Sequence, residues 1–257
     1  MHLVKYCASG NDFLITHHFK PQNRQALAKA LCNRHYGFGA DGLVVLLPHP
    51  KFAYTWEFYN ADGSLANMCG NASRCVGLYA YTQGLASKKH RFLSGAGVIS
   101  LEVLEVTQSG GVVQSNLGTP KWLDTLEIEG QEWAFIDSGV PHLVHFVDHL
   151  NKMPKAKTPA MQALRQKFNA NVNIAYIENP STIHLATYER GVEDITLACG
   201  TGMGAVFFAG LKRGVENKAH CIPPSGEVLA WRLKGADVCF SGEVKRVGAV
   251  IDHGCGH

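Results

Sequence analysis

Two cysteines stand in closely similar surroundings and are the residues best suited to chemistry. Cys69 and Cys199 each follow a polar stretch and precede a glycine, a small polar residue and an apolar run. The runs reach Tyr81 and Leu211, and each predicts a buried helix that begins at its cysteine. Two thiols placed alike in two similar segments suggest a facing pair. Such a pair can remove a proton from one face of a carbon atom and return one to the other face.

The expected helix N-termini add a second property to these segments. A helix N-terminus has unpaired N–H groups and a positive partial charge, so it favours a thiolate and binds a carboxylate. A glycine after each cysteine lets a ligand approach the backbone closely. Both effects favour removal of the α-proton of an amino acid, because the carbanion spreads its charge onto the carboxylate. One cysteine would act as thiolate base and the other as thiol acid, a coupled pair that needs no cofactor in principle.

An internal repeat extends beyond the cysteines. Cys69 and Cys199 are 130 positions apart, and residues 9–14 match residues 138–143 at a spacing of 129. Two landmarks at nearly equal spacing predict an internal duplication. The chain is therefore expected to form two similar α+β domains with a small-molecule site in the cleft between them. The expected domains are residues 1–116, joined by a final strand over 245–257, and residues 117–244.

Hydrophobic periodicity predicts the elements that position the cysteines. Besides the two cysteine helices, helices are expected over residues 24–33 and 158–168. Strands are expected over residues 3–6, 13–15, 43–47, 56–59, 98–106, 111–116, 133–137, 143–147, 172–177, 182–188, 226–233, 237–241 and 245–251.

Composition excludes several classes of protein. The 257 residues are 46% apolar and 18% charged with a net charge of +3, which is typical of a globular protein able to bury a sizeable core. Because no long basic run occurs, no nucleic-acid partner is expected, and the basic clusters at 87–91 and 212–213 are expected to be solvated turns.

The same survey gives expectations about compartment and metals. The start of the chain has no secretory pattern and no run is apolar enough to span a membrane, so a cytoplasmic location is expected. The eight cysteines are then expected to be reduced, and since no Cys-x-x-Cys occurs, no metal site is expected. Cys255, between His253 and His257, is expected to lie in a frayed terminus rather than at a metal ion.

Eight short segments, in this order, carry a resemblance to a known family. They are Gly10-Asn11-Asp12-Phe13, Gly37-Phe38-Gly39-Ala40-Asp41-Gly42-Leu43, Asn60-Ala61-Asp62-Gly63-Ser64, Met68-Cys69-Gly70-Asn71, Pro141-His142, Asn171-Val172-Asn173, Tyr188-Glu189-Arg190-Gly191 and Ala198-Cys199-Gly200-Thr201-Gly202. Over nearly its whole length the chain resembles the diaminopimelate epimerases. The resemblance implies two similar domains, each a strongly curved mixed β-sheet around a buried central helix.

The resemblance also implies a function. It is epimerisation between LL-2,6-diaminopimelate and meso-2,6-diaminopimelate without pyridoxal phosphate, in lysine and peptidoglycan precursor biosynthesis, by a homodimer without cofactor or metal. Cys69 and Cys199 are then the catalytic acid/base pair. The implied contacts to the reacting carboxylate are Gly70, Asn71, Gly200 and Thr201. The implied contacts to the amino groups and the distal end are Asn11, Asn60, Asn173, Glu189 and Arg190.

Two of these interpretations have alternatives. Arg190 suits a distal carboxylate because its planar fork can bind one bidentately, but it could instead form an ion pair with Glu193 or Asp194. His142 could tune the thiols together with Glu189, or it could be a satisfied core residue.

The chain also departs from the family pattern. Val140 stands where an asparagine is common, Gly42 where many members have glutamine, and the loop 191–197 is one residue longer. Ala72 and Ser73 replace a Gly-Ala pair. A cofactor-independent racemase of another amino acid is therefore the first alternative. A thiol redox or metal-binding protein is the alternative from another class.

Overall fold

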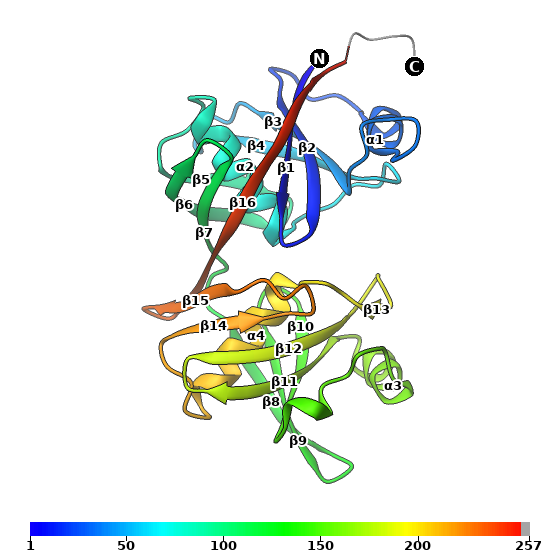
Figure 1. The fold of residues 1–257 in the computed structure, drawn as a ribbon, viewed down its shortest axis with the longest axis vertical. Helices are drawn as coiled ribbons and strands as arrows, with labels where there is room; N and C mark the ends of the chain where they lie inside the picture. Colours follow the sequence, from blue (N-terminus) through cyan, green and yellow to red (C-terminus); the bar gives the residue numbers. More distant parts are fainter. Residues whose placement is uncertain (253–257) are drawn as a thin grey trace. The chain divides into compact units, whose positions relative to one another are not determined.

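The computed structural model describes residues 1–252, so the expectation for Cys255 lies outside the described residues. The chain divides into two compact units (Figure 1). Unit 1 is Met1–Ser115 together with the chain from Gly242 onward, and unit 2 is Asn116–Ser241.

Unit 1 is a mixed sheet that closes on itself. Its elements are β1 (His2–Ala8), β2 (Asn11–His17), α1 (Gln25–Cys32), β3 (Gly42–Leu47), β4 (Thr55–Asn60), α2 (Gly70–Thr82), β5 (Lys89–Ser94), β6 (Gly97–Thr107), β7 (Gly110–Asn116) and the later part of β16 (Asp237–Ile251). The strands follow one another in the order β1 to β7, then β16, and β16 also pairs with β1. The closed sheet encloses a core of mostly apolar side chains.

Unit 2 repeats the design with an open sheet. Its elements are β8 (Lys121–Ile128), β9 (Gln131–Asp137), β10 (Pro141–Val147), a short 3₁₀ turn (Leu150–Lys152), α3 (Pro159–Phe168), β11 (Asn171–Asn179), β12 (Thr182–Glu189), β13 (Asp194–Ile195), α4 (Gly200–Leu211), β14 (Lys218–Ile222), β15 (Leu229–Lys234) and the beginning of β16. The order runs β16-β15-β14-β12-β11-β10-β9-β8, with β13 paired to β12.

Matching strand pairs confirm the predicted duplication. The pairs β1–β2, β2–β3, β3–β4 and β4–β5 are antiparallel, parallel, antiparallel and parallel. The pairs β9–β10, β10–β11, β11–β12 and β12–β14 repeat that series. Phe13 is opposite Gly42 in unit 1, and His142 is opposite Asn171 in unit 2. Both residues of the second pair lie 129 positions after their counterparts, so the two registers coincide.

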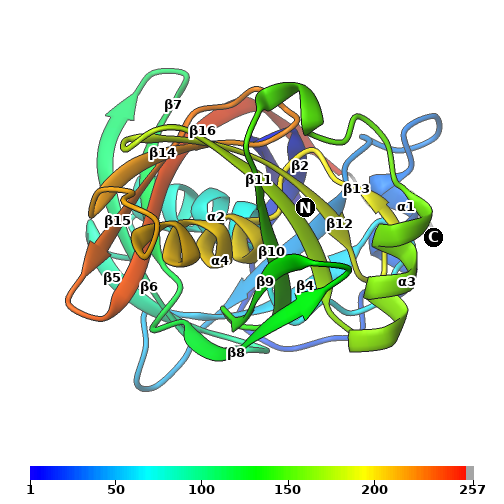
Figure 2. The ribbon, with the colours of Figure 1, turned by 90° about the horizontal axis from the view of Figure 1, so that it is seen from below.

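Each unit has a buried helix inside its curved sheet (Figure 2). In unit 1, α2 packs on β1, β2, β3 and β6, and in unit 2, α4 packs on β9 to β12 and β14. Small residues allow this close approach: a Cβ at Gly77 would lie 2.8 Å from Leu101, and one at Gly204 would lie 3.2 Å from the Trp231 ring. The expected helices at both cysteines are therefore confirmed, as is the helix over 158–168, whose N-cap Thr158 accepts a hydrogen bond from Met161 N.

The observed elements differ from the expected ones in three places. The basic cluster 87–91 was expected as a turn, but Lys89–Ser94 forms β5, in which Phe92 and Ser94 are buried while Lys89 and Arg91 are exposed. β8 and β14 were not predicted, since their patterns contain few consecutive apolar residues. Residues 237–241 and 245–251 were expected as two strands but form one continuous strand, β16.

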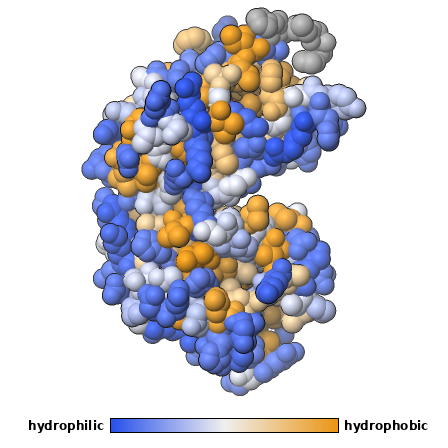
Figure 3. Space-filling view, in the orientation of Figure 1, coloured by the Kyte–Doolittle hydropathy of each residue, from blue (hydrophilic) through white to orange (hydrophobic). Residues whose placement is uncertain are grey.

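Within residues 1–252, no helix is long and apolar enough to cross a membrane. Hydrophilic side chains cover most of the visible surface of each unit, interrupted by smaller apolar patches (Figure 3).

Candidate active site

Cys69 is the N-cap residue of α2. Its backbone is extended, with φ −147° and ψ 126°, and the first helical hydrogen bond runs from Ser73 N to its carbonyl oxygen at 2.9 Å. The side chain is partly buried and forms no cap bond to the helix. The first N–H groups of a helix have no partner inside the helix, so the start of α2, at Gly70 and Asn71, has the donors that an anion requires.

Asn11 and Asn71 are brought together in unit 1. Nδ2 of Asn71 donates to Oδ1 of Asn11 at 2.7 Å, and Asn71 is only 4% exposed. Asn11 begins β2 directly after the turn at Ser9 and Gly10, both of which have positive φ. That turn therefore directs Asn11 towards the N-terminus of the buried helix.

Asn60 is the last residue of β4 and is exposed. Its Nδ2 donates to Ser64 Oγ at 3.0 Å, and Ser64 in turn bonds to the Asp62 carboxylate. These bonds hold a tight turn in which Gly63 has a φ of +85°. The turn fixes the position of Asn60 without covering it.

Gly42 has a packing reason in this chain. A Cβ at this position would lie 2.7 Å from the Tyr59 carbonyl oxygen and 2.9 Å from the Phe58 ring. No side chain fits there unless β3 and β4 move apart. The glycine that this chain has in place of the common glutamine is therefore required by the close packing of β3 against β4, and it is more than the loss of a polar group.

Cys199 is the N-cap residue of α4 and is 7% exposed. Its Sγ accepts a hydrogen bond from Gly202 N at 3.4 Å and lies 3.6 Å from Thr201 Oγ1. Ser138, in the turn before β10, donates to the Thr201 carbonyl oxygen at 2.7 Å. Unlike the thiol of Cys69, this thiol caps its own helix.

The Glu189 side chain lies beside Cys199. Burial raises the pKa of Glu189 above its ordinary value, and the Thr196 and Cys199 side chains beside it partly offset that rise. Glu189 ends β12 and is followed by a tight turn in which Glu193 N donates to its carbonyl oxygen at 2.8 Å. The strand end and the turn together hold the carboxyl group at the thiol.

Arg190 is held by backbone contacts and forms no ion pair with the described residues. Its Nη1 donates to the Asn169 carbonyl oxygen at 3.0 Å, and its backbone N donates to Asn171 Oδ1 at 2.7 Å. The two acids considered as its partners are engaged elsewhere, Glu193 by Arg165 and Asp194 by Lys157. The geometry therefore disfavours the ion-pair interpretation.

Asn173 and His142 lie in the core of unit 2, and neither is exposed. Asn173 Nδ2 donates to His142 Nδ1 at 3.1 Å and to the Leu143 carbonyl oxygen at 2.8 Å, while its Oδ1 accepts from Thr187 at 2.8 Å. Burial, with a smaller contribution from the Arg190 charge, lowers the pKa of His142 to about 3. His142 is therefore neutral at ordinary pH, as a satisfied core histidine would be.

Sequence reasoning did not single out several residues that hold these groups. They are Ser9, Ser138, Asn171, Thr187, Thr196, Asp41 and Arg74. Ser9 and Ser138 had a signal, since both belong to the repeat at a spacing of 129. Asp41 and Asn171 stand in segments that carry the family resemblance, but their bonds to Asn11 and to Arg190 N join residues distant in sequence.

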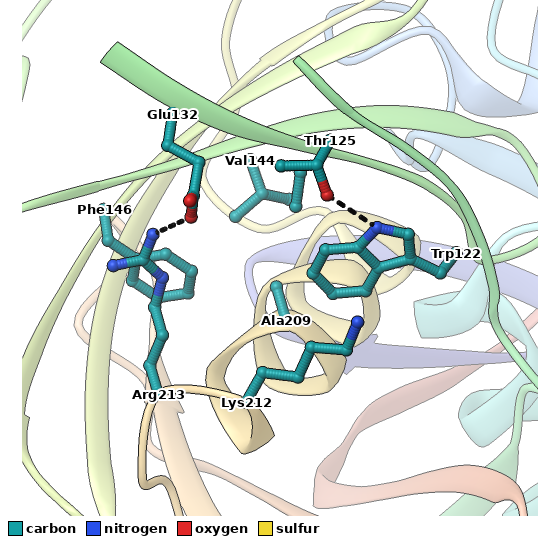
Figure 4. Close-up of a pocket in the computed structure, with 9 residues that line it drawn as sticks. Trp122, Thr125, Glu132, Val144, Phe146, Ala209, Lys212 and Arg213 are labelled. Atoms are coloured by element: carbon teal, nitrogen blue, oxygen red, sulfur yellow. Dashed lines mark hydrogen bonds and ion pairs between the residues drawn. The ribbon is translucent and has the colours of Figure 1, made fainter. Parts of the chain in front are cut away.

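Unit 2 also contains a hollow of about 420 Å³ that includes neither cysteine (Figure 4). Its lining residues are Trp122, Thr125, Glu132, Ala134, Val144, Phe146, Ala209, Lys212 and Arg213. Both cations already have partners: Lys212 lies 3.6 Å from the centre of the Trp122 ring, and Arg213 pairs with Glu132. We assign no site to it.

Comparison with known proteins identifies the family. The sequence model described as diaminopimelate epimerase matches residues 3–123 and 134–247. The chain belongs to the diaminopimelate epimerase family. A diaminopimelate epimerase of a Nitratiruptor species is 52% identical over 96% of this chain and 96% of its own length. One of Helicobacter pylori is 48% identical over 99% of this chain and all of its own length.

Solved structures show the same fold at much lower identity. A hydroxyproline epimerase from Agrobacterium vitis, solved with bound trans-4-hydroxy-L-proline, has a TM-score of 0.70 at 13% identity. The match covers 97% of this chain and 91% of that chain. The epimerase fold expected from the sequence, with two similar α+β domains, is thereby confirmed.

Proposed function

We propose that this protein interconverts LL-2,6-diaminopimelate and meso-2,6-diaminopimelate, with Cys69 and Cys199 as its acid/base pair. The protein is an isomerase of the epimerase class, and the reaction serves lysine and peptidoglycan precursor biosynthesis. The observation that carries the assignment of the pair is structural equivalence. Each cysteine is the N-cap of the buried helix in one of two units with the same strand order.

The helix N-termini would hold the reacting carboxylate. Gly70 and Asn71 begin α2, and Gly200 and Thr201 begin α4. Backbone N–H groups there can bind the carboxylate of the substrate and stabilise the negative charge that moves onto it as the α-proton leaves. No metal or electron-withdrawing cofactor takes part in this proposal.

The proton transfers balance between the two thiols. One thiolate takes the proton from Cα, and the electron pair of the C–H bond moves onto the carboxylate as an enediolate. The other thiol donates its proton to the opposite face of Cα, which inverts the centre. After turnover the first sulfur is a thiol and the second a thiolate, so the enzyme is poised for the reverse reaction.

Glu189 would assign the starting roles. A carboxylate that accepts a hydrogen bond from the Cys199 thiol favours the protonated sulfur, because a thiolate there would face a like charge. In the resting enzyme Cys199 is then the acid, and Cys69 is the base.

The unequal parts of the two units would recognise the two ends of the substrate. Asn60 ends β4 and Glu189 ends β12, at equivalent positions 129 apart. Arg190 follows Glu189 and has no acidic partner among the described residues, so its guanidinium suits the distal carboxylate. Asn11 would contact an amino group, and the buried Asn173 would act by holding the start of α4.

The test is a direct assay of purified, reduced protein. Chiral chromatography should show LL-diaminopimelate converting to the meso isomer until both are present at equilibrium. A parallel panel of proline, hydroxyproline, glutamate, alanine and lysine should remain unchanged. Racemisation of a panel member without turnover of diaminopimelate would favour the alternative of another amino acid substrate.

Two further expectations accompany this function. We also propose that the protein acts in the cytoplasm as a homodimer, and the resemblance to the family implies the dimer. Light scattering coupled to size-exclusion chromatography would measure the mass, and a monomeric mass would rule out the dimer.

A further inference from the structure

Four side chains in unit 1 form a continuous series of hydrogen bonds. Nη2 of Arg74 donates to Oδ1 of Asn71 at 3.0 Å, and Nδ2 of Asn71 donates to Oδ1 of Asn11 at 2.7 Å. Nδ2 of Asn11 then donates to Oδ2 of Asp41 at 3.1 Å. We call this series the amide relay. Its two middle members are the asparagines assigned to the substrate, and its two ends have no assigned role.

The ends of the relay have opposite hydrogen-bonding character. Arg74 can only donate, and an ionised Asp41 can only accept. An asparagine amide between them can satisfy both neighbours in one orientation only, with its oxygen towards Arg74 and its nitrogen towards Asp41. The two charged ends therefore fix which atom each amide presents.

Further contacts hold both ends in place. Arg74 is fully buried, and its Nη2 also donates to Ser9 Oγ at 2.6 Å. Asp41 Oδ2 accepts the backbone N–H of Asp12 at 3.1 Å, and its Oδ1 accepts from Arg34 at 2.8 Å. Since every partner of Asp41 is a donor, a neutral amide at this position would turn its NH₂ group towards another donor.

The relay belongs to unit 1 alone. At the spacings that relate the two units, Arg74 corresponds to Gly204, Asn11 to Val140 and Asp41 to Ala170. None of these unit 2 residues has a polar side chain. Thus the thiol, the turn and the helix occur in both units, whereas the device that orients amides occurs once.

We propose that Arg74 and Asp41 are positioning residues that set the orientation of the Asn71 and Asn11 amides for the substrate, which rests on the function proposed above. Oδ1 of Asn11 has a second lone pair that can accept from a substrate ammonium group. A flipped amide would place an N–H donor there and oppose the ammonium. The relay thereby selects an amino group over a carboxylate at that point.

The first test replaces Asp41 by its neutral isostere. Asp41→Asn should lower kcat/KM for LL-diaminopimelate about tenfold, mainly through KM, because the acceptor-only end is lost. The side-chain amide protons of Asn11 and Asn71, observed by NMR in ¹⁵N-asparagine-labelled protein, should also exchange with water faster than in wild type.

A matched control is Asp12→Asn, which makes the same chemical change in the same cluster. Asp12 pairs with Lys5 and Arg34 but touches neither amide of the relay through its side chain. Asp12→Asn should lower thermal stability while leaving KM and the amide exchange rates of Asn11 and Asn71 as in wild type.

Arg74 supplies a second variant pair. Arg74→Lys keeps a donor-only group and should retain more activity than Arg74→Gln, whose amide can either donate or accept. Equal losses in the two variants would contradict a role for donor character.

The outcomes separate this inference from the proposed function. Unchanged KM and amide exchange in Asp41→Asn, or equal changes in Asp12→Asn, would overturn the positioning role. If wild-type protein failed to turn over diaminopimelate, the proposed function would fail. The amide exchange rates of Asp41→Asn and Asp12→Asn would still decide whether the relay fixes the amides.

Discussion

At the scale of single residues, the two thiols differ in what surrounds them. Cys199 accepts a hydrogen bond from its own helix and has Glu189 beside it, whereas Cys69 makes no cap bond. The same residue type thus occupies equivalent positions in unlike environments. The proposed acid and base, which would exchange roles in each turnover, require such a difference in the resting state.

Removing either thiol should abolish net inversion. Cys69→Ala and Cys199→Ala should each lower kcat for epimerisation by about 1,000-fold or more, because each removes one proton carrier. Initial rates from chiral chromatography provide the measurement. Cys239→Ala is the control: that thiol is buried in the core of unit 2, so its loss should reduce stability by about 1 kcal/mol and leave the rate intact. Retained turnover in either active-site variant would contradict the assignment.

Glu189→Gln should lose activity and gain stability at neutral pH. Burial raises the pKa of Glu189, so between its ordinary and raised values the folded protein binds more protons than the unfolded chain. Wild-type stability therefore falls as pH rises through that window, and the neutral glutamine avoids this loss. Urea unfolding should show the variant's advantage at pH 7 shrinking towards pH 4, together with at least about tenfold lower kcat. An advantage independent of pH would count against a buried, ionised Glu189.

The sequence singles out the residues whose chemistry suits the proposed reaction, and it does not single out those that we propose to position them. A cysteine before glycine at two equivalent places is visible without a structure. Asp41 and Asn171 were missed as positioning residues, because their roles come from bonds to Asn11 and to the Arg190 backbone, and both partners are distant in sequence. Gly42 was interpreted as a lost polar group, but the close Tyr59 carbonyl provides a packing reason.

At the scale of elements, the start of α4 depends on a polar contact beneath it. The pair of Asn173 and Thr187, from β11 and β12, lies directly under Gly202 in the first turn of the helix. β11, β12 and α4 pack closely at Gly202, because glycine has no side chain that would hold them apart. This packing fixes the position of Cys199 at the start of α4.

Gly202→Ala should disturb that contact. The added Cβ would lie 2.7 Å from both Asn173 Oδ1 and Thr187 Oγ1, so the helix start must shift. We expect a loss of about 2 kcal/mol in the free energy of unfolding, measured with urea, and a lower kcat. Gly248→Ala is the control, since its Cβ meets nothing within 4 Å. Equal stability of the two variants would refute the close contact.

The buried His142, at the start of β10, should make unit 2 sensitive to acid. The pKa of His142 is lowered to about 3 in the folded protein, whereas its ordinary pKa is 6.5. Between these two pH values His142 is protonated in the unfolded chain but neutral in the folded protein. The free energy of unfolding should fall with decreasing pH, by up to about 1.4 kcal/mol per pH unit. His142→Gln should show a shallower slope in urea titrations between pH 4 and pH 6. Identical slopes would mean that His142 is not held neutral.

Most elements could be predicted because their apolar periodicity is local. The helices after Cys69 and Cys199 are apolar, and the helix at Pro159 has a capping threonine. Each of these local patterns is sufficient by itself to predict its helix. β5 and β14 could not be predicted in the same way. Their inward residues alternate with Lys89, Arg91 and His220, and the surrounding sheet rather than propensity makes them strands.

At the scale of the whole molecule, the duplicated fold suits the proposed reaction at the two faces of one carbon atom. Both units keep the strand order, the turn before the second strand, and the buried helix with a cysteine at its N-terminus. They differ in the amide relay of unit 1 and in the pair Glu189 and Arg190 of unit 2, the residues proposed to contact the two ends of the substrate. Equal spacings made the duplication predictable, but the functions of its unequal parts emerged only from contacts within each unit.

The central claim is that two different thiols serve opposite faces of one carbon, and solvent deuterium tests it most directly. Wild-type enzyme should be incubated with LL-diaminopimelate in D₂O, and both isomers analysed by mass spectrometry at early times. The account predicts that the meso product contains one deuterium at the inverted carbon while the remaining substrate retains protium. A meso product that retains the substrate's own proton would show that a single base serves both faces, and would contradict the account.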